Sequence, residues 1–85
     1  MTLNPNFAGK TFVVTGKIEG MTRGDAENLI RMNGGNAAAS VTKDTNVLVV
    51  GDKPGSKLKK AQTLIASNVP ISIINEQEFL DMTAQ

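Results

Sequence analysis

Residues 47–61 read VLVVGDKPGSKLKKA, and the change of pattern within this stretch decides the fold of the chain. Its first four residues form a continuous apolar run, which is typical of a strand buried on both faces of a parallel sheet. Gly51 ends the run, and a polar loop up to Gly55 leads into a helix that begins at Ser56. The inward face of this helix is predicted to consist of Leu58, Ala61, Leu64 and Ile65.

Three more stretches have strand patterns. Residues 10–15 (KTFVVT) are a β-branched and aromatic run that ends at Gly16. Residues 36–40 (NAAAS) can form a short second strand whose small side chains permit close packing, and residues 71–74 (ISII) follow as the fourth strand. Residues 41–46 are interpreted as a polar turn between the second and third strands.

Two further helices are predicted from their ends. Thr22 and Asp25 have the spacing of a capping box, so a helix is expected to begin there. The pair Gly34-Gly35 ends this helix, with one glycine in the left-handed conformation, and Asn75 caps a last helix. The apolar contacts are Ala26, Leu29 and Ile30 in the first helix and Phe79, Leu80 and Met82 in the last. The resulting β-α-β-β-α-β-α order predicts an α/β fold with a small, mainly parallel sheet and helices on both faces.

Length and composition narrow the class of protein. The chain has 85 residues, of which 40% are hydrophobic and 20% charged, which fits one globular domain with a shallow surface site rather than a deep cavity. It contains no cysteine and no histidine, so we expect no disulfide, no zinc or copper site and no cofactor. Since no apolar run approaches the length of a membrane span, we expect a soluble, cytoplasmic protein that does not bind membranes.

Charge is distributed unevenly along the chain although the net charge is only +1. All nine Lys and Arg residues lie within residues 1–60, together with five acids, whereas residues 61–85 hold three acids and no base. One end of the fold is therefore expected to be basic. For any single lysine, plain solvation of the surface explains the charge equally well.

Three lysines, Lys57, Lys59 and Lys60, follow the predicted start of the helix at Ser56. A helix N-terminus carries a partial positive charge and free N–H groups, so acids are normally preferred there. The last helix follows that preference, with Glu76 and Glu78 in its first turn. The lysines therefore indicate that an anion binds at the second helix.

A second connection between a strand and a helix has a similar composition, since Thr15-Gly16 is followed by Arg23. Ligands of open α/β sheets lie beyond the carboxyl ends of the strands, where both connections should meet. The Thr15 hydroxyl and the Gly16 N–H can donate to phosphate oxygens, while Arg23 and Lys57 supply positive charge. Taken alone, Thr15-Gly16 is more simply explained as an ordinary tight turn.

Familiar catalytic and nucleotide motifs do not fit. The run from Gly51 to Lys57 is one residue short of a Walker A loop and has its serine before the lysine, and no G-x-G-x-x-G follows the first strand. Without histidine or cysteine, catalysis would need a carboxylate pair or a serine activated by lysine, and no spacing indicates either. We therefore expect a binding module rather than an enzyme.

Four segments together resemble a known family: residues 7–16 (FAGKTFVVTG), Gly34-Gly35, residues 45–51 (TNVLVVG) and residues 55–61 (GSKLKKA). They are similar to the BRCT domain, and the GSKxxKA helix start is most similar to the subclass found in bacterial NAD-dependent DNA ligases and in the large subunit of replication factor C. The resemblance implies a four-stranded parallel sheet in the order 2-1-3-4, with the first and third helices on one face and the second on the other. It places the domain at residues 7–82, between a flexible segment 1–6 and a tail 83–85.

The resemblance also implies a function. The residues that match the phosphate pocket of the family are Thr15, Gly16, Arg23 and Lys57. Beside this pocket, Lys17, Lys53, Lys59 and Lys60 are candidates for contacts to the DNA backbone, although each is equally well explained as a solvated lysine. These matches imply a non-catalytic module of DNA replication or repair, associated with the nucleoid, that binds 5′-phosphorylated duplex ends.

Two other functions stay open at this stage. The same pocket could bind a phosphopeptide or dock onto a protein partner, or onto other domains of the same polypeptide. Alternatively, the domain could be purely structural, with a vestigial pocket.

Overall fold

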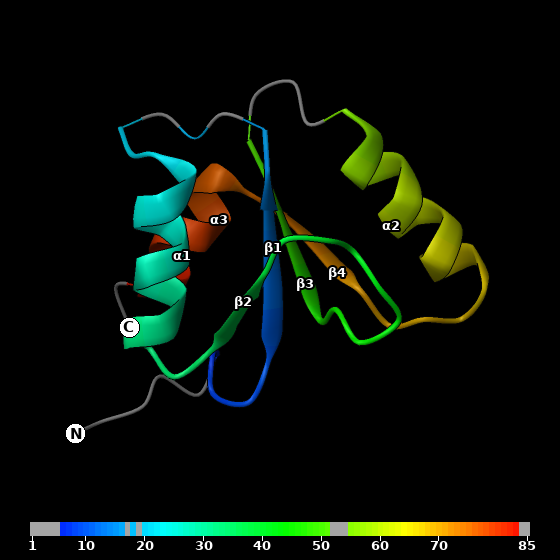
Figure 1. Cartoon of the computed structure of the whole chain (residues 1–85), viewed down its shortest axis with the longest axis horizontal. Helices are drawn as coiled ribbons and strands as arrows, with labels where there is room; N and C mark the ends of the chain where they lie inside the picture. The colour runs from blue at the N-terminus through cyan, green and yellow to red at the C-terminus, as the bar shows by residue number, and fades with distance from the viewer. Residues whose placement is uncertain (1–5, 17, 19, 52–54, 84–85) are drawn as a thin grey trace.

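The computed structural model describes residues 6–16, 18, 20–51 and 55–83. The described chain forms four strands and three helices, in the order predicted from the sequence (Figure 1). These elements are β1 (Thr11–Thr15), α1 (Arg23–Met32), β2 (Asn36–Ala38), β3 (Val47–Val50), α2 (Ser56–Ala66), β4 (Ser72–Asn75) and α3 (Glu76–Thr83).

The sheet is parallel throughout and has the strand order β2-β1-β3-β4, so the expected α/β fold is confirmed. β3 pairs with β1 on one side and with β4 on the other, and the register places Val50 beside both Thr15 and Asn75. This central position explains the continuous apolar run of β3, because its side chains are covered on both faces. β4 lies at an edge and is more exposed.

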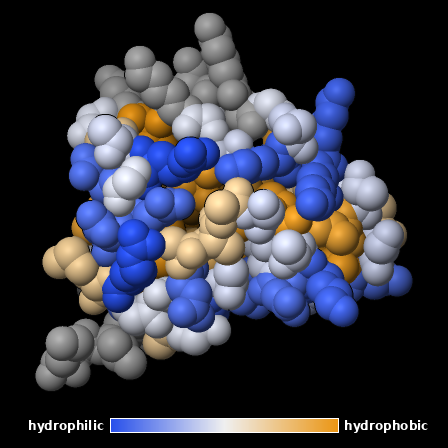
Figure 2. All heavy atoms as spheres, in the orientation of Figure 1, coloured by the Kyte–Doolittle hydropathy of each residue, from blue (hydrophilic) through white to orange (hydrophobic). Residues whose placement is uncertain are grey.

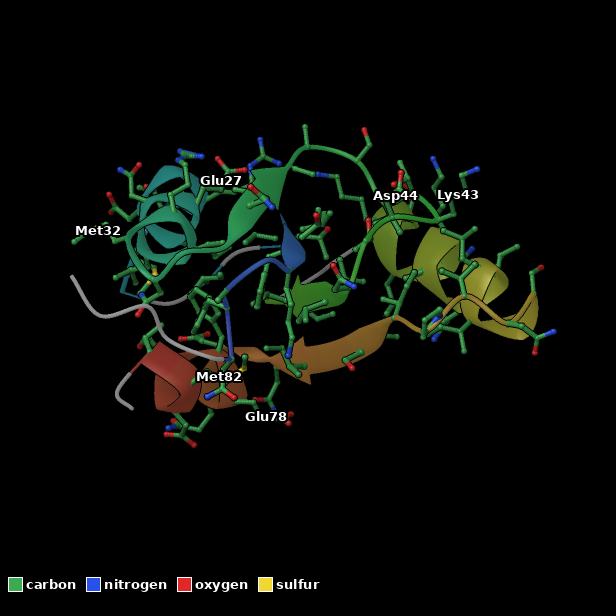
Figure 3. All side chains as sticks on the ribbon, turned by 90° about the horizontal axis from the view of Figure 1, so that it is seen from below. Glu27, Met32, Lys43, Asp44, Glu78 and Met82 are labelled. Carbon is green, nitrogen blue, oxygen red and sulfur yellow. The ribbon has the colours of Figure 1, made fainter. Side chains whose placement is uncertain are left out.

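The two faces of the sheet are covered by different helices, as Figures 1 and 3 show. Phe12 and Val14 of β1 pack with α1 and α3, whereas Val13 between them packs with α2. This division follows from the pleat, since successive side chains of a strand point to opposite faces. The predicted arrangement of helices on both faces is therefore confirmed.

Three phenylalanines connect the ends of the described chain on the side of α1 and α3. Phe7 stacks on Phe12 with ring centroids 4.9 Å apart and meets Phe79 edge to face at 6.1 Å. All three side chains are fully buried. Since offset and edge-to-face ring pairs add to the free energy of apolar burial, this cluster fixes both the segment before β1 and the helix α3.

The predicted caps of α1 are present. The Asp25 N–H donates to the Thr22 hydroxyl at 3.1 Å, and the Thr22 N–H donates to the Asp25 carboxylate at 3.3 Å. At the other end Gly34 takes the left-handed conformation with φ of 92°, as a helix-terminating glycine should. Gly35 then passes close to the core, because a Cβ on it would lie 2.8 Å from Cγ2 of Ile30.

Three details differ from the sequence predictions. β4 begins at Ser72 rather than Ile71. Val41, assigned to a polar turn, is buried in the core on the α2 side. Ile65 is 39% exposed instead of facing inward, whereas Leu64 next to it packs against the core on the α2 side. The predicted terminal segments fall mostly outside the described residues, so those boundaries stay a prediction.

Candidate nucleic-acid interface

The strand order creates a switch point at the carboxyl edge of the sheet. After β1 the chain continues through α1 to β2, whereas after β3 it continues through α2 to β4, on the other face and in the opposite direction. A crevice at such a point is where open α/β sheets bind ligands. A hydrogen bond connects the ends of the two strands, since the Gly51 N–H directly after β3 donates to the Thr15 carbonyl at the end of β1 at 2.8 Å.

Thr15 and Gly16 lie at this edge. Thr15 is the last residue of β1 and is only 4% exposed, whereas Gly16 is exposed and has φ of 78°. That backbone conformation favours glycine, and the missing side chain also lets a ligand approach the main chain closely. Within the described residues, no hydrogen bond occupies the Gly16 N–H. The position therefore offers a backbone donor beside a largely buried threonine.

Arg23 and Lys57 flank this edge from opposite faces of the sheet. Arg23 is the first residue of α1 and is exposed, and Lys57 is the second residue of α2 and is half-buried. Figure 1 shows that both helices begin at the edge where β1 and β3 end. Among the described residues neither side chain forms an ion pair or a hydrogen bond, so both cations are available to an anionic ligand.

The start of α2 differs from those of the other two helices. α1 has its capping box, and α3 has the same arrangement, since the Glu78 N–H donates to the Asn75 amide oxygen at 2.8 Å and the Asn75 N–H donates to the Glu78 carboxylate at 3.3 Å. The cap residue of α2 is Gly55, which provides no side-chain hydrogen bond, and the first turn carries no acid. The free N–H groups of this turn can therefore interact with an anion.

Of the four lysines that were expected to contact the DNA backbone, the structure describes two. Lys59 and Lys60 are exposed on α2, whereas Lys17 and Lys53 lie outside the described residues. In the orientation of Figure 1, the space-filling view shows hydrophilic side chains over the upper part of α2, where the helix begins, and apolar ones below them (Figure 2). The surface next to the candidate site is thus polar.

The structure also contains a depression that the sequence did not predict. It has a volume of about 410 Å³ and is open to solvent. Its lining residues are Val50, Gly51, Asn75, Glu76 and Gln77. The depression borders the switch point on the β4 side, and among the described residues that line it Glu76 alone is charged. Sequence reasoning could not find it, because its two halves are brought together only by the pairing of β3 with β4.

Residues 2–82 match the BRCA1 C Terminus (BRCT) domain family. The chain belongs to this family. The four-stranded parallel sheet with α2 alone on one face agrees with the fold that the resemblance implied.

Relatives of this BRCT domain include DNA ligases of several bacteria. The chain is 56% identical over 72 residues to a DNA ligase of Chlamydia felis, which is 85% of this chain and 10% of the ligase. It is 47% identical to DNA ligases of Prochlorococcus marinus and Coxiella burnetii, over 89% and 88% of this chain. The chain spans about a tenth of the length of these relatives, and the similarity to a ligase BRCT domain is thereby confirmed.

Within the part of the chain that the structure describes, no helix combines the length and the hydropathy needed to cross a bilayer.

Proposed function

We propose that this BRCT domain is a non-catalytic DNA-binding module that holds the 5′-phosphate of a duplex end at the carboxyl edge between β1 and β3. One observation carries the proposal: Gly16 directly after β1, Arg23 at the start of α1 and Lys57 at the start of α2 border one edge, beside a helix start without a side-chain cap. The similarity to DNA ligases supports a DNA end as the ligand. The module would serve a ligase, of the NAD-dependent class that the sequence resembles, in replication and repair.

Each group has a distinct task in this proposal. The Gly16 N–H donates to one phosphate oxygen, and the uncapped turn of α2 supplies further backbone donors. Lys57 contributes a mobile ammonium group, and Arg23 a planar fork of donors from the opposite face. The Thr15 hydroxyl is largely buried, so it can take part only when the phosphate is seated at the very end of β1.

The same arrangement favours the DNA backbone over the bases. All three phenylalanines are fully buried, and the sequence has no tyrosine or tryptophan. The domain therefore lacks the exposed aromatic rings on which readers of single strands stack bases. If Lys57 and its neighbours neutralise three or four phosphates, the slope of log affinity against log salt is roughly −3 to −4 on duplex DNA.

The proposal is tested by fluorescence anisotropy with a short labelled duplex, with and without a 5′-phosphate, at two salt concentrations. The proteins compared are the unchanged chain, Lys57→Ala and the control Lys10→Ala, which removes an exposed charge just before β1. Because a hydrogen bond to a charged group contributes about 1.5–3 kcal/mol, Lys57→Ala should weaken binding to the phosphorylated end at least about tenfold. Lys10→Ala should bind like the unchanged chain.

The outcomes separate three functions. Tighter binding to the phosphorylated duplex that is lost only in Lys57→Ala supports capture of the end. Equal binding to both duplexes would contradict it and reduce the function to general attraction to the backbone. If neither duplex binds, a phosphopeptide or protein partner becomes the better hypothesis.

A further inference from the structure

Apart from Lys10, which lies just before β1, the charged side chains of the described residues divide between the two faces of the sheet. The α2 face carries four lysines and a single carboxylate: Lys43, Lys57, Lys59, Lys60 and Asp44. The opposite face carries two arginines and five carboxylates: Arg23, Arg31, Asp25, Glu27, Glu76, Glu78 and Asp81. The acids of the last 25 residues lie on α3, so the asymmetry seen along the sequence separates a basic α2 face from an acidic α1/α3 face.

Lys43 belongs to the basic face although it is distant from α2 in sequence. It lies in the loop between β2 and β3, and Figure 3 shows Lys43 and Asp44 beside α2, on the side away from Glu27 of α1 and Glu78 of α3. The loop is attached to that face by Val41, which is 1% exposed and packs in the cluster that also contains Ala61 of α2. The fold thus extends the basic surface beyond the helix.

The loop that carries Lys43 is held by its own hydrogen bonds. The Thr42 N–H donates to the Thr45 hydroxyl at 2.9 Å, the Thr45 N–H donates to the Thr42 carbonyl at 3.0 Å, and the Asp44 N–H donates to the Thr42 hydroxyl at 3.2 Å. Thr45 is only 2% exposed. The backbone around Lys43 is therefore ordered before any ligand binds, which reduces the entropy lost on binding.

We infer that the α2 face, including Lys43, is the surface along which the duplex backbone runs from the captured end. The inference rests on the proposed function, because the switch point fixes where the duplex starts. Eleven residues of α2 span about 16 Å, a length that corresponds to about five base pairs. The acidic α1/α3 face repels phosphates, so the duplex leaves the edge on the α2 side. Lys43 thereby contacts a phosphate farther from the end than Lys57 does.

The test measures the salt dependence of duplex binding for the unchanged chain, Lys43→Ala and Lys10→Ala, with and without a 5′-phosphate. Loss of one phosphate contact reduces the slope of log affinity against log salt by about 0.9. On lowering the salt from about 0.2 M to about 0.05 M, the affinity of Lys43→Ala should then rise about threefold less than that of the unchanged chain. The change should be the same on both duplexes, because Lys43 lies away from the end, and Lys10→Ala should leave the slope unchanged.

Failure of this inference can be told apart from failure of the proposed function. If the phosphorylated end is preferred but Lys43→Ala keeps the original slope, the path along α2 is wrong and end capture stands. If Lys43→Ala makes the slope of log affinity against log salt less steep but the two duplexes bind equally well, the path of the duplex along α2 is supported and end capture is wrong. An equal loss in Lys43→Ala and Lys10→Ala overturns the inference, since the attraction of DNA would then not depend on the α2 face, and absence of binding to either duplex overturns both the inference and the proposed function.

Discussion

Adding a single methyl group at Gly35 should destabilise the fold strongly. A Cβ there would lie 2.8 Å from Cγ2 of Ile30, 3.1 Å from the Phe7 carbonyl oxygen and 3.2 Å from the Ile30 carbonyl oxygen. The Ile30 carbonyl already accepts the Gly35 N–H at 2.9 Å, and both Ile30 and Phe7 are fully buried. Because two of the three obstacles are backbone atoms, the chain can make room only by moving the end of α1 or the segment at Phe7.

Overpacking of this kind costs about 1–3 kcal/mol, and we expect Gly35→Ala to cost at least the middle of that range, about 2 kcal/mol, because two of the obstacles are backbone atoms. For a domain of this size such a loss lowers the melting temperature by about 8–16 °C. Urea denaturation followed by circular dichroism measures it as a lower midpoint with an unchanged slope. A midpoint equal to or above that of the unchanged chain would refute the packing argument.

Gly24 provides a matched control. It lies in the first turn of α1, and a Cβ there would meet only the Thr22 hydroxyl, at 3.7 Å. The same substitution, Gly24→Ala, should therefore raise the free energy of unfolding by about 0.5 kcal/mol, because alanine loses less backbone entropy in a helix than glycine. If Gly35→Ala lowers the free energy of unfolding while Gly24→Ala raises it, the loss of stability at Gly35 comes from the close contacts of the added Cβ and not from the change of glycine to alanine.

Two further predictions concern helix ends. Thr22→Ala removes the hydroxyl that accepts from the Asp25 N–H and should lower the free energy of unfolding by about 1 kcal/mol, measured in the same urea titration. Thr22→Ser keeps a hydroxyl at this position and should retain most of the stability that the cap provides. Asn68 follows α2 in the left-handed conformation with φ of 70°. Asn68→Gly should raise the melting temperature by a few degrees, since relief of this conformation contributes about 0.5–1 kcal/mol. An unchanged or lower melting temperature would show that the asparagine side chain stabilises the turn.

The sequence predicted most of the fold because local patterns and tertiary packing agree there. The run of β3 is apolar throughout since that strand is central, and the pairs that cap α1 and α3 lie within four residues of each other. Val41 was missed because a lone apolar residue among polar ones has no period to detect. The position of Ile65 was wrong since helical periodicity describes only the helix and not which of the neighbours Leu64 and Ile65 faces the sheet.

For the candidate site too, the local sequence predicts the residue types but not which of them lie close together in the fold. The residue types at Thr15-Gly16 and Lys57 are compatible with a phosphate ligand, although Thr15-Gly16 taken alone is more simply explained as a tight turn. That the two loops meet depends on β1 lying next to β3, and this strand order came from the resemblance to BRCT domains rather than from any periodicity. The contribution of Lys43 requires a further step, because only the folded loop brings that residue to the α2 face.

If the cations at the start of α2 bind DNA as proposed, they do so at the expense of stability. A positive charge in the first turn opposes the helix dipole and costs about 0.3–1 kcal/mol, and within the described residues Lys57 has no carboxylate partner to offset this cost. Lys57→Ala should therefore raise the free energy of unfolding slightly while weakening DNA binding. If the variant instead lost stability and binding together, its weaker binding would report a damaged fold, and Lys57 would have a structural role. A more stable variant with weaker binding would show that the sequence at α2 was selected for its ligand and not for the helix.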